Sequence, residues 1–122
     1  MLTLKLPYPP TVNQYWRHNR GRTHISGEGV RYCKQVAAMY CNAVQVTGRL
    51  SVSIVTRQPD KRKRDLDNVL KCTLDSLQKA GVIRDDGDID RLVIERGPMD
   101  RDDPHIVVLI EPKLARSVSV GG

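Results

Sequence analysis

The sequence contains no phenylalanine, and its one tryptophan and four tyrosines make up 4% of the 122 residues. A core poor in aromatic rings must be built from aliphatic side chains, with Trp16 and the tyrosines nearer its margin. The length is that of one domain. No apolar run approaches the roughly 20 residues that span a membrane, and the N-terminus lacks the apolar segment of a signal peptide. We therefore expect a cytoplasmic protein without a membrane partner.

Cysteine is also scarce. Cys33, Cys41 and Cys72 are odd in number and form no C-x-x-C pair. They fall in stretches with helical periodicity, where buried free thiols are common. The pattern argues against both a disulfide framework and a zinc site.

Acidic residues are nearly missing from the first half of the chain. Residues 1–64 carry twelve Lys and Arg against two acids, a net charge of +10, whereas residues 65–122 carry eight against twelve, a net charge of −4. A basic half attracts polyanions, and an acidic half repels them unless a cation lies between. This asymmetry favours a nucleic-acid enzyme that uses a metal, although a basic domain whose acids cap helices would show it too.

The hydrophobic pattern predicts an α+β domain with a mixed sheet and two main helices, in the order β-α-β-α-β-β. Strands are expected at residues 2–6, 50–55, 91–96 and 106–111, one helix from Ser26 to near Gly48, and a second from Leu66 to Gly81. Residues 8–25 read as a long loop and a candidate binding element. Residues 1–116 form the expected domain, and 117–122 a tail.

Residues 61–68, KRKRDLDN, join four consecutive cations to two carboxylates. If the second helix begins here, Asp65 lies at its N-cap and Asp67 in its first turn, so both carboxylates gather at one helix end. Capping alone explains one acid, at about 0.5–2 kcal/mol. Lys71, four residues after Asp67, lies on the same helix face; it forms either a simple ion pair or a cation placed to contact a phosphate.

A second acidic cluster, IRDDGDID, follows the second helix. Its glycine is misplaced for a calcium-binding EF-hand, and no Glu stands twelfth from Asp86. Taken alone it is a solvated turn. Together with Asp65 and Asp67, it offers the hard oxygen ligands that Mg²⁺ or Mn²⁺ prefers.

Two other metal-site patterns are weaker. Asp60 with Glu111 and Lys113 could form the PD…ExK arrangement of restriction-type nucleases, but such short matches arise often by chance. The three histidines, His18, His24 and His105, do not form a convincing alternative site.

Several motifs taken in order resemble the RusA family of Holliday junction resolvases: RHNRGRTHIS, the run KRKR, DLDNVLKCTLDSLQKAGVI and the following RDD. The similarity covers nearly the whole chain. It implies a homodimeric, Mg²⁺-dependent endonuclease, with Mn²⁺ a possible substitute, that nicks two strands of a four-way DNA junction symmetrically. A bacterial or phage-infected cell and association with the nucleoid would follow.

The resemblance also implies roles for individual residues. Asp65 and Asp67 match the family's D-x-D motif, Lys71 its essential lysine, and Asp86 its third carboxylate, although Asp85, Asp88 and Asp90 crowd that position. DNA contacts are expected from a set of basic and polar residues on both sides of the first helix: Lys61, Arg62, Lys63, Arg64, Asn13, Arg17, Arg20 and Arg22.

Two alternatives stay open on sequence grounds. One is another metal-dependent nuclease that selects flaps or RNA; the other is a non-enzymatic basic DNA-binding module whose carboxylates are structural. Metal-dependent nicking separates the second alternative from the nucleases, and a comparison of junction, duplex and flap substrates separates the nucleases from each other.

Overall fold

The computed structural model describes residues 1–10, 16–19, 22–40, 42–43, 45–62 and 65–113, with the backbone alone for 17–19 and 22–24. In these residues the elements follow in this order: β1 (Leu2–Pro7), β2 (Trp16–Asn19), β3 (Arg22–Ile25), α2 (Gly27–Met39), β4 (Leu50–Arg57), α3 (Leu66–Lys79), the 3₁₀ helix η1 (Asp86–Asp88), β5 (Ile89–Arg96) and β6 (His105–Pro112). The predicted α+β class and the β-α-β-α-β-β order of the main body are confirmed. No helix among the described residues is long and apolar enough to cross a membrane.

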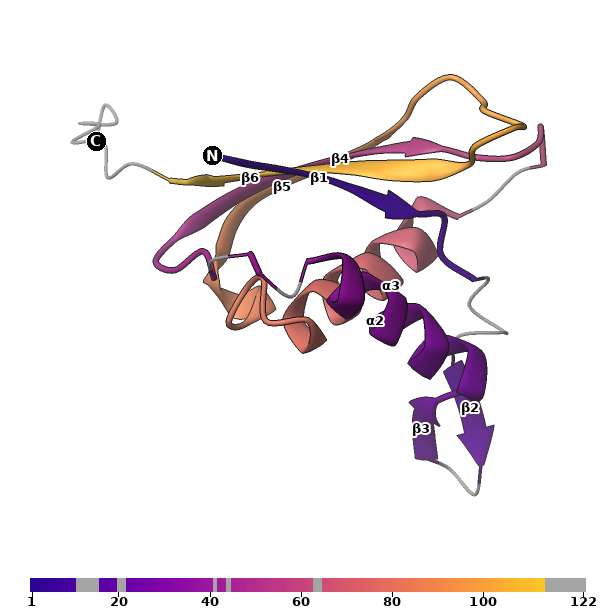
Figure 1. Ribbon diagram of the computed structural model, residues 1–122, viewed down its shortest axis with the longest axis horizontal. Coiled ribbons are helices and arrows are strands. Elements are labelled where there is room, and N and C mark those ends of the chain that lie inside the picture. The colour runs from indigo at the N-terminus through magenta and orange to yellow at the C-terminus, as the bar shows by residue number, and fades with distance from the viewer. Residues whose placement is uncertain (11–15, 20–21, 41, 44, 63–64, 114–122) are drawn as a thin grey trace, which may run out of the picture.

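The main sheet has the strand order β1-β6-β4-β5. β6 lies antiparallel to both β1 and β4, whereas β5 is parallel to β4 because α3 carries the chain back between them. Both helices cover the same face of this sheet (Figure 1). The strand order makes β1 and β5 the two edge strands of the sheet.

The core lies between the sheet and the helices. Along β4, buried and half-buried residues alternate, so that Leu50, Val52 and Ile54 face the helices. Val36 of α2 and Leu77 of α3 pack against them with no exposed surface. As expected from the lack of phenylalanine, the largest fully buried side chains of this core are aliphatic.

Helix α2 begins as predicted and ends earlier than predicted. The Ser26 hydroxyl accepts a hydrogen bond from the Gly29 N–H at 3.1 Å, which confirms the N-cap. The helix stops at Met39 rather than near Gly48, because Tyr40 leaves the helical conformation. Its hydroxyl accepts a hydrogen bond from the Lys5 N–H at 2.9 Å and donates one to the Lys5 carbonyl at 2.6 Å, so a contact with β1 ends the helix.

The stretch 8–25, predicted as a loop, contains a two-stranded antiparallel hairpin, β2–β3. The prediction of an irregular segment was wrong here because strands of four residues are too short to show a hydrophobic period. Figure 1 shows the hairpin extending away from the sheet beside the start of α2.

Candidate functional site

The start of α3 brings the D-x-D carboxylates together. Asp65 is the N-cap, and its Oδ1 accepts a hydrogen bond from the Asp67 N–H at 3.0 Å. Asp67 lies in the first turn and forms this bond through its backbone N–H, so its carboxylate takes no part in the cap. Asp65 and Asp67 are both exposed. The helix end therefore presents two carboxylates to solvent, as the sequence predicted.

Lys71 lies one turn after Asp67. Its Nζ is 3.5 Å from Asp67 Oδ2, and both side chains are 61% exposed. An ion pair so exposed contributes at most about 0.5 kcal/mol to folding. The ion pair therefore adds little to the stability of the fold, and the Lys71 ammonium group lies in solvent beside the Asp67 carboxylate.

A fixed turn holds the cations before α3. The buried Gln58 amide donates hydrogen bonds to the carbonyls of Asp60, at 2.9 Å, and Arg62, at 2.7 Å. The Asp60 carboxylate accepts from the Arg62 N–H at 3.0 Å. Lys61 and Arg62 are exposed, so this turn presents both cations to solvent, four and three residues before Asp65 in the sequence. Gln58 was missed in the sequence because a single glutamine after a strand carries no motif.

Other predicted DNA contacts are less completely described. Lys63, Arg64, Asn13 and Arg20 lie outside the described residues. Arg17 and Arg22 belong to the backbone of the hairpin, in which Arg17 pairs with His24 and Arg22 with Asn19. The hairpin thus places the backbones of Arg17 and Arg22 on its two paired strands.

Two acids of the second acidic cluster are paired with basic side chains. Asp88 is buried and accepts two hydrogen bonds from the Arg84 guanidinium, at 2.9 and 3.2 Å. Asp90 accepts from Arg49 Nε at 2.8 Å, and Lys113 Nζ lies 3.9 Å away. These two carboxylates therefore serve the fold, and the cluster's remaining acids, Asp85 and Asp86, are exposed.

Asp85 and Asp86 differ in their electrostatics. The Gly87 N–H, which donates to Asp85 Oδ1 at 3.1 Å, holds the pKa of Asp85 below its usual value. A hydrogen bond with the Asp85 side chain raises the pKa of Asp86. A cation bound beside these two carboxylates would favour the ionised form of both.

The two acidic groups lie at opposite ends of α3. The Asp86 N–H donates to Gln78 Oε1 at 3.3 Å, which fixes Asp86 beside the last turn of the helix. Asp65 caps the first turn, thirteen residues before Gln78, which is about 20 Å along the helix at 1.5 Å per residue. Figure 1 shows α3 running from the end of β4 to the start of β5. Asp65 and Asp67 therefore meet each other within one chain, and neither meets Asp86.

One chain does not bring together Asp60 and Glu111 of the PD…ExK pattern. Glu111 pairs with Ser51 at the start of β4, whereas Asp60 follows Arg57 at its end. About six residues of strand at 3.3 Å each separate those two levels of the sheet. Asp60 and Glu111 are too far apart to bind one ion.

Asp100, Asp103 and His105 form a cluster that the sequence did not single out. In the described part of the chain, ligand atoms of these three residues lie within 4.8 Å of one another. Each has a structural partner: the Asp103 N–H donates to Asp100 at 3.0 Å, His105 Nδ1 lies 2.6 Å from the Asp103 carbonyl, and Lys5 pairs with the Asp103 carboxylate. These contacts close the turn before β6.

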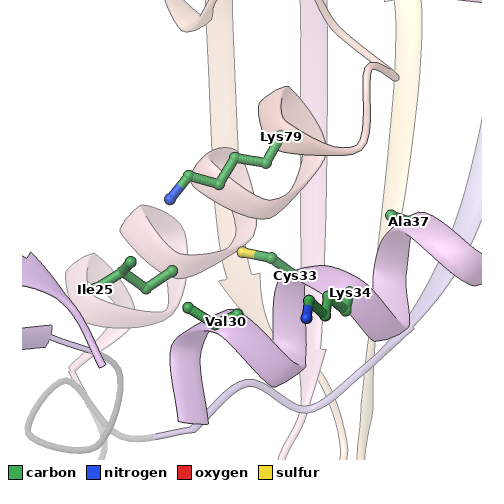
Figure 2. Close-up of a pocket in the computed structure, with 6 residues that line it drawn as sticks. All are labelled: Ile25, Val30, Cys33, Lys34, Ala37 and Lys79. Atoms are coloured by element: carbon green, nitrogen blue, oxygen red, sulfur yellow. The ribbon is translucent and has the colours of Figure 1, made fainter. Parts of the chain in front are cut away.

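A hollow of about 220 Å³ lies between α2 and α3 (Figure 2). Its walls are mainly apolar, with two lysines at the rim: Ile25, Val30, Cys33, Lys34, Ala37 and Lys79. Among the residues that the structure describes, no carboxylate lines it, so these residues do not provide the ligands of a metal-dependent reaction. The helix end at Asp65 is the better candidate for the functional site.

Comparison with known proteins identifies relatives along most of the chain. Residues 7–111 match the family described as Endodeoxyribonuclease RusA. The Crossover junction endodeoxyribonuclease RusA of Escherichia coli (strain K12) is 44% identical over 90 residues, which are 71% of this chain and 75% of that protein. The protein of that name from Enterobacteria phage 82 is 44% identical over 89 residues, 70% of this chain and 74% of its own.

Proposed function

Because the chain belongs to the RusA family of endodeoxyribonucleases, which hydrolyse phosphodiester bonds, we propose that it resolves four-way DNA junctions by paired symmetric nicks that require Mg²⁺. The relatives' names, which specify crossover junctions, support the substrate. Membership of a nuclease family counts against the reading of a DNA-binding module without activity. The bacterial and phage relatives support action in the cytoplasm of a bacterial or phage-infected cell, at the nucleoid.

The residues at the start of α3 fit a hard divalent cation. Mg²⁺ in proteins uses one or two carboxylates together with waters and substrate phosphate. Asp65 and Asp67 supply two exposed carboxylates from one helix turn, and the cap hydrogen bond occupies one oxygen of Asp65. Mn²⁺ has the same preference for oxygen ligands. When bound, such an ion acidifies a water and polarises the scissile phosphate.

The cations around these acids have separate tasks. Lys61 and Arg62, with Lys63 and Arg64 beside them in the sequence, bind phosphates of the backbone and bring the polyanion to an acidic site. Lys71, 3.5 Å from Asp67, donates hydrogen bonds to the phosphate oxygen on which charge develops. Asn13 and the hairpin arginines Arg17, Arg20 and Arg22 contact the arms of the junction.

Asp86 joins this site from a second chain. Within one chain about 20 Å of helix separates it from Asp65, so a site with three carboxylates requires two copies. A two-fold dimer supplies Asp65 and Asp67 from one subunit and Asp86 from the other, twice over. This separation along α3 is the observation that carries the proposal, and paired nicking follows from the presence of two equal sites.

The test uses a labelled four-way junction, a duplex and a flap of matched sequence, incubated with protein in Mg²⁺ or in chelator. The proposal expects Mg²⁺-dependent nicks at symmetric positions of the junction, with the other two substrates cut far more slowly. The variant Asp67→Asn should still bind the junction, because it loses a ligand and a negative charge near phosphate, and should not nick it. Faster cutting of flaps or duplex would overturn the proposed substrate.

A further inference from the structure

The outer edge of β5 has the features of an interface between two copies of this chain. Six of its eight residues are exposed, among them Arg91, Leu92, Val93 and Glu95, although β5 belongs to the main sheet. We propose that two copies pair along β5 as antiparallel strands, with Val93 of each facing Val93 of the other across a two-fold axis. The partner is a second copy of this chain, and the surface is the one that would form the two-chain site proposed above. The antiparallel orientation of the two β5 strands rests on that proposed function.

The two edges of the sheet differ. At β1, the Tyr40 hydroxyl occupies both the N–H and the carbonyl of Lys5, at 2.9 and 2.6 Å. A strand edge blocked in this way cannot accept another strand. Along the part of the chain that the structure describes, no segment pairs with the outer side of β5. β5 is therefore the edge that remains available.

The two faces of β5 carry different residues. Leu92 and Ile94 pair in register with Val52 and Ile54, which point into the core, so they lie on the helix side of the sheet. Val93 pairs with Ser53 and lies on the open side. Leu92 and Val93 are 40% and 37% exposed, so both faces of β5 leave aliphatic surface in contact with solvent.

With Val93 on the two-fold axis, every residue from 91 to 95 meets a suitable partner. Leu92 lies opposite Ile94 of the partner subunit on the helix side, which extends the apolar core across the axis. Arg91 lies opposite Glu95 of the partner subunit on the open side, twice by symmetry. Opposed charges and aliphatic pairs at directly facing positions stabilise antiparallel strands.

Neighbouring registers lose the pairing of Arg91 with Glu95. Facing residues lie on the same face of a sheet, so the two-fold axis moves by one residue and the register by two. With the axis at Leu92, Arg91 lies opposite Val93 of the partner subunit, and with the axis at Ile94, Glu95 lies opposite Val93 of the partner subunit. The charge pattern of β5 is thus self-complementary in one register.

This pairing also places the correct ends together. β4 and β5 are parallel, and α3 begins after the end of β4 and finishes at η1, just before β5. In an antiparallel pair, the start of β5 in one subunit lies level with the end of β5 in the other. Asp86 is thereby moved toward Asp65 of the partner subunit, which is the arrangement that the three-carboxylate site needs.

Disulfide trapping tests the axis directly. Facing residues in an antiparallel pair have Cα atoms about 4.5–5.5 Å apart, within the range of a disulfide. The variant Val93→Cys, with Cys41→Ser to leave only the buried Cys33 and Cys72, should form on mild oxidation a covalent dimer of twice 13.8 kDa. Val30→Cys in the same background is the matched control, because Val30 is also 37% exposed but lies on α2.

Charge exchange tests the register. Arg91→Glu and Glu95→Arg each set like charges opposite one another twice, and each should weaken self-association roughly 10- to 100-fold in sedimentation. An equimolar mixture of the two variants restores Glu opposite Arg in the heterodimer and should associate nearly as tightly as the wild type. Weakening without recovery in the mixture would overturn the register.

The two proposals fail in different ways. A wild-type dimer in which Val93→Cys forms disulfides no faster than Val30→Cys would overturn the β5 interface and leave the two-chain nuclease standing. A protein that nicks junctions while remaining monomeric in sedimentation would overturn both the interface and the two-chain site. Rapid trapping at residue 93 with recovery in the charge mixture supports the interface, whatever the substrate proves to be.

Discussion

Asp65 has two roles in this account, and paired substitutions separate them. Its Oδ1 caps α3 through the Asp67 N–H, and under the proposed function its charge also helps to bind the cation. Asp65→Ala removes both the acceptor and the charge. Asp65→Asn keeps an oxygen acceptor in the same place and removes only the charge, since Asn and Asp are about equally good N-caps.

The magnitudes follow from the size of the domain. Loss of an N-cap costs about 1 kcal/mol of the free energy of unfolding. At about 2.1 cal/mol/K of unfolding entropy per residue, a chain of 122 residues should lose about 4 °C of Tm for that cost. Asp65→Asn forfeits a helix-dipole interaction of at most about 1 kcal/mol and should melt between Asp65→Ala and the wild type.

Junction nicking should respond differently. Both variants lose a cation ligand, so both should nick about 1000-fold more slowly or worse, as loss of several kcal/mol of metal-supplied stabilisation implies. The assays are thermal denaturation by circular dichroism and single-turnover nicking of a labelled junction. Near-normal nicking by Asp65→Asn would show that its carboxylate is only a cap, and equal melting temperatures for the two variants would refute the capping argument.

Four further predictions test separate parts of the structure. Lys71→Met should lower Tm by less than 2 °C, because the 61% exposed pair contributes at most about 0.5 kcal/mol, while nicking falls by orders of magnitude; normal turnover would remove Lys71 from the site. Asp88→Asn should cost about 1–3 kcal/mol in urea unfolding by breaking a buried pair with Arg84, yet leave nicking by the folded protein intact, and Asp86→Asn should do the reverse; the opposite pattern would exchange their roles. Glutamine at Lys61 and Arg62 should reduce the slope of log affinity against log salt by up to about two, and an unchanged slope would mean that neither contacts a phosphate. Burial raises the pKa of the Cys72 thiol to about 12, whereas the unfolded thiol ionises at about 8.5. The free energy of unfolding should therefore fall as the pH rises above about 8.5. In urea unfolding, Cys72→Ala should show a smaller fall, and an equal fall would contradict this origin.

The sequence predicted the main body of the fold because its signals are local. Alternation of buried and half-buried residues along β4, the Ser26 cap of α2 and the Asp65 cap of α3 all lie within a few residues of the elements they define. The end of α2 was misplaced because a contact distant in the sequence, from Tyr40 to Lys5, decides it. The hairpin was missed because its strands are four residues long.

The candidate site shows the same division. The gathering of Asp65, Asp67 and Lys71 follows from helical spacing and is present. The place of Asp86 depends on the length of α3 and on the Gln78 contact, which no motif encodes. Which acids of the second cluster pair with arginines could be predicted only in part, since Arg84 precedes Asp88 by four residues but Arg49, just before β4, is distant in the sequence from Asp90.

The most direct measurement of the central claim combines two inactive variants. Asp67→Asn and Asp86→Asn should each be unable to nick a four-way junction. If each site takes Asp65 and Asp67 from one subunit and Asp86 from the other, a heterodimer of the two variants has one intact site and one doubly altered site. Refolding the two variants together should therefore restore Mg²⁺-dependent nicking of one strand per junction, because up to about half of the heterodimer's sites are intact. A mixture that binds junctions, forms heterodimers and nicks nothing would contradict the two-chain site.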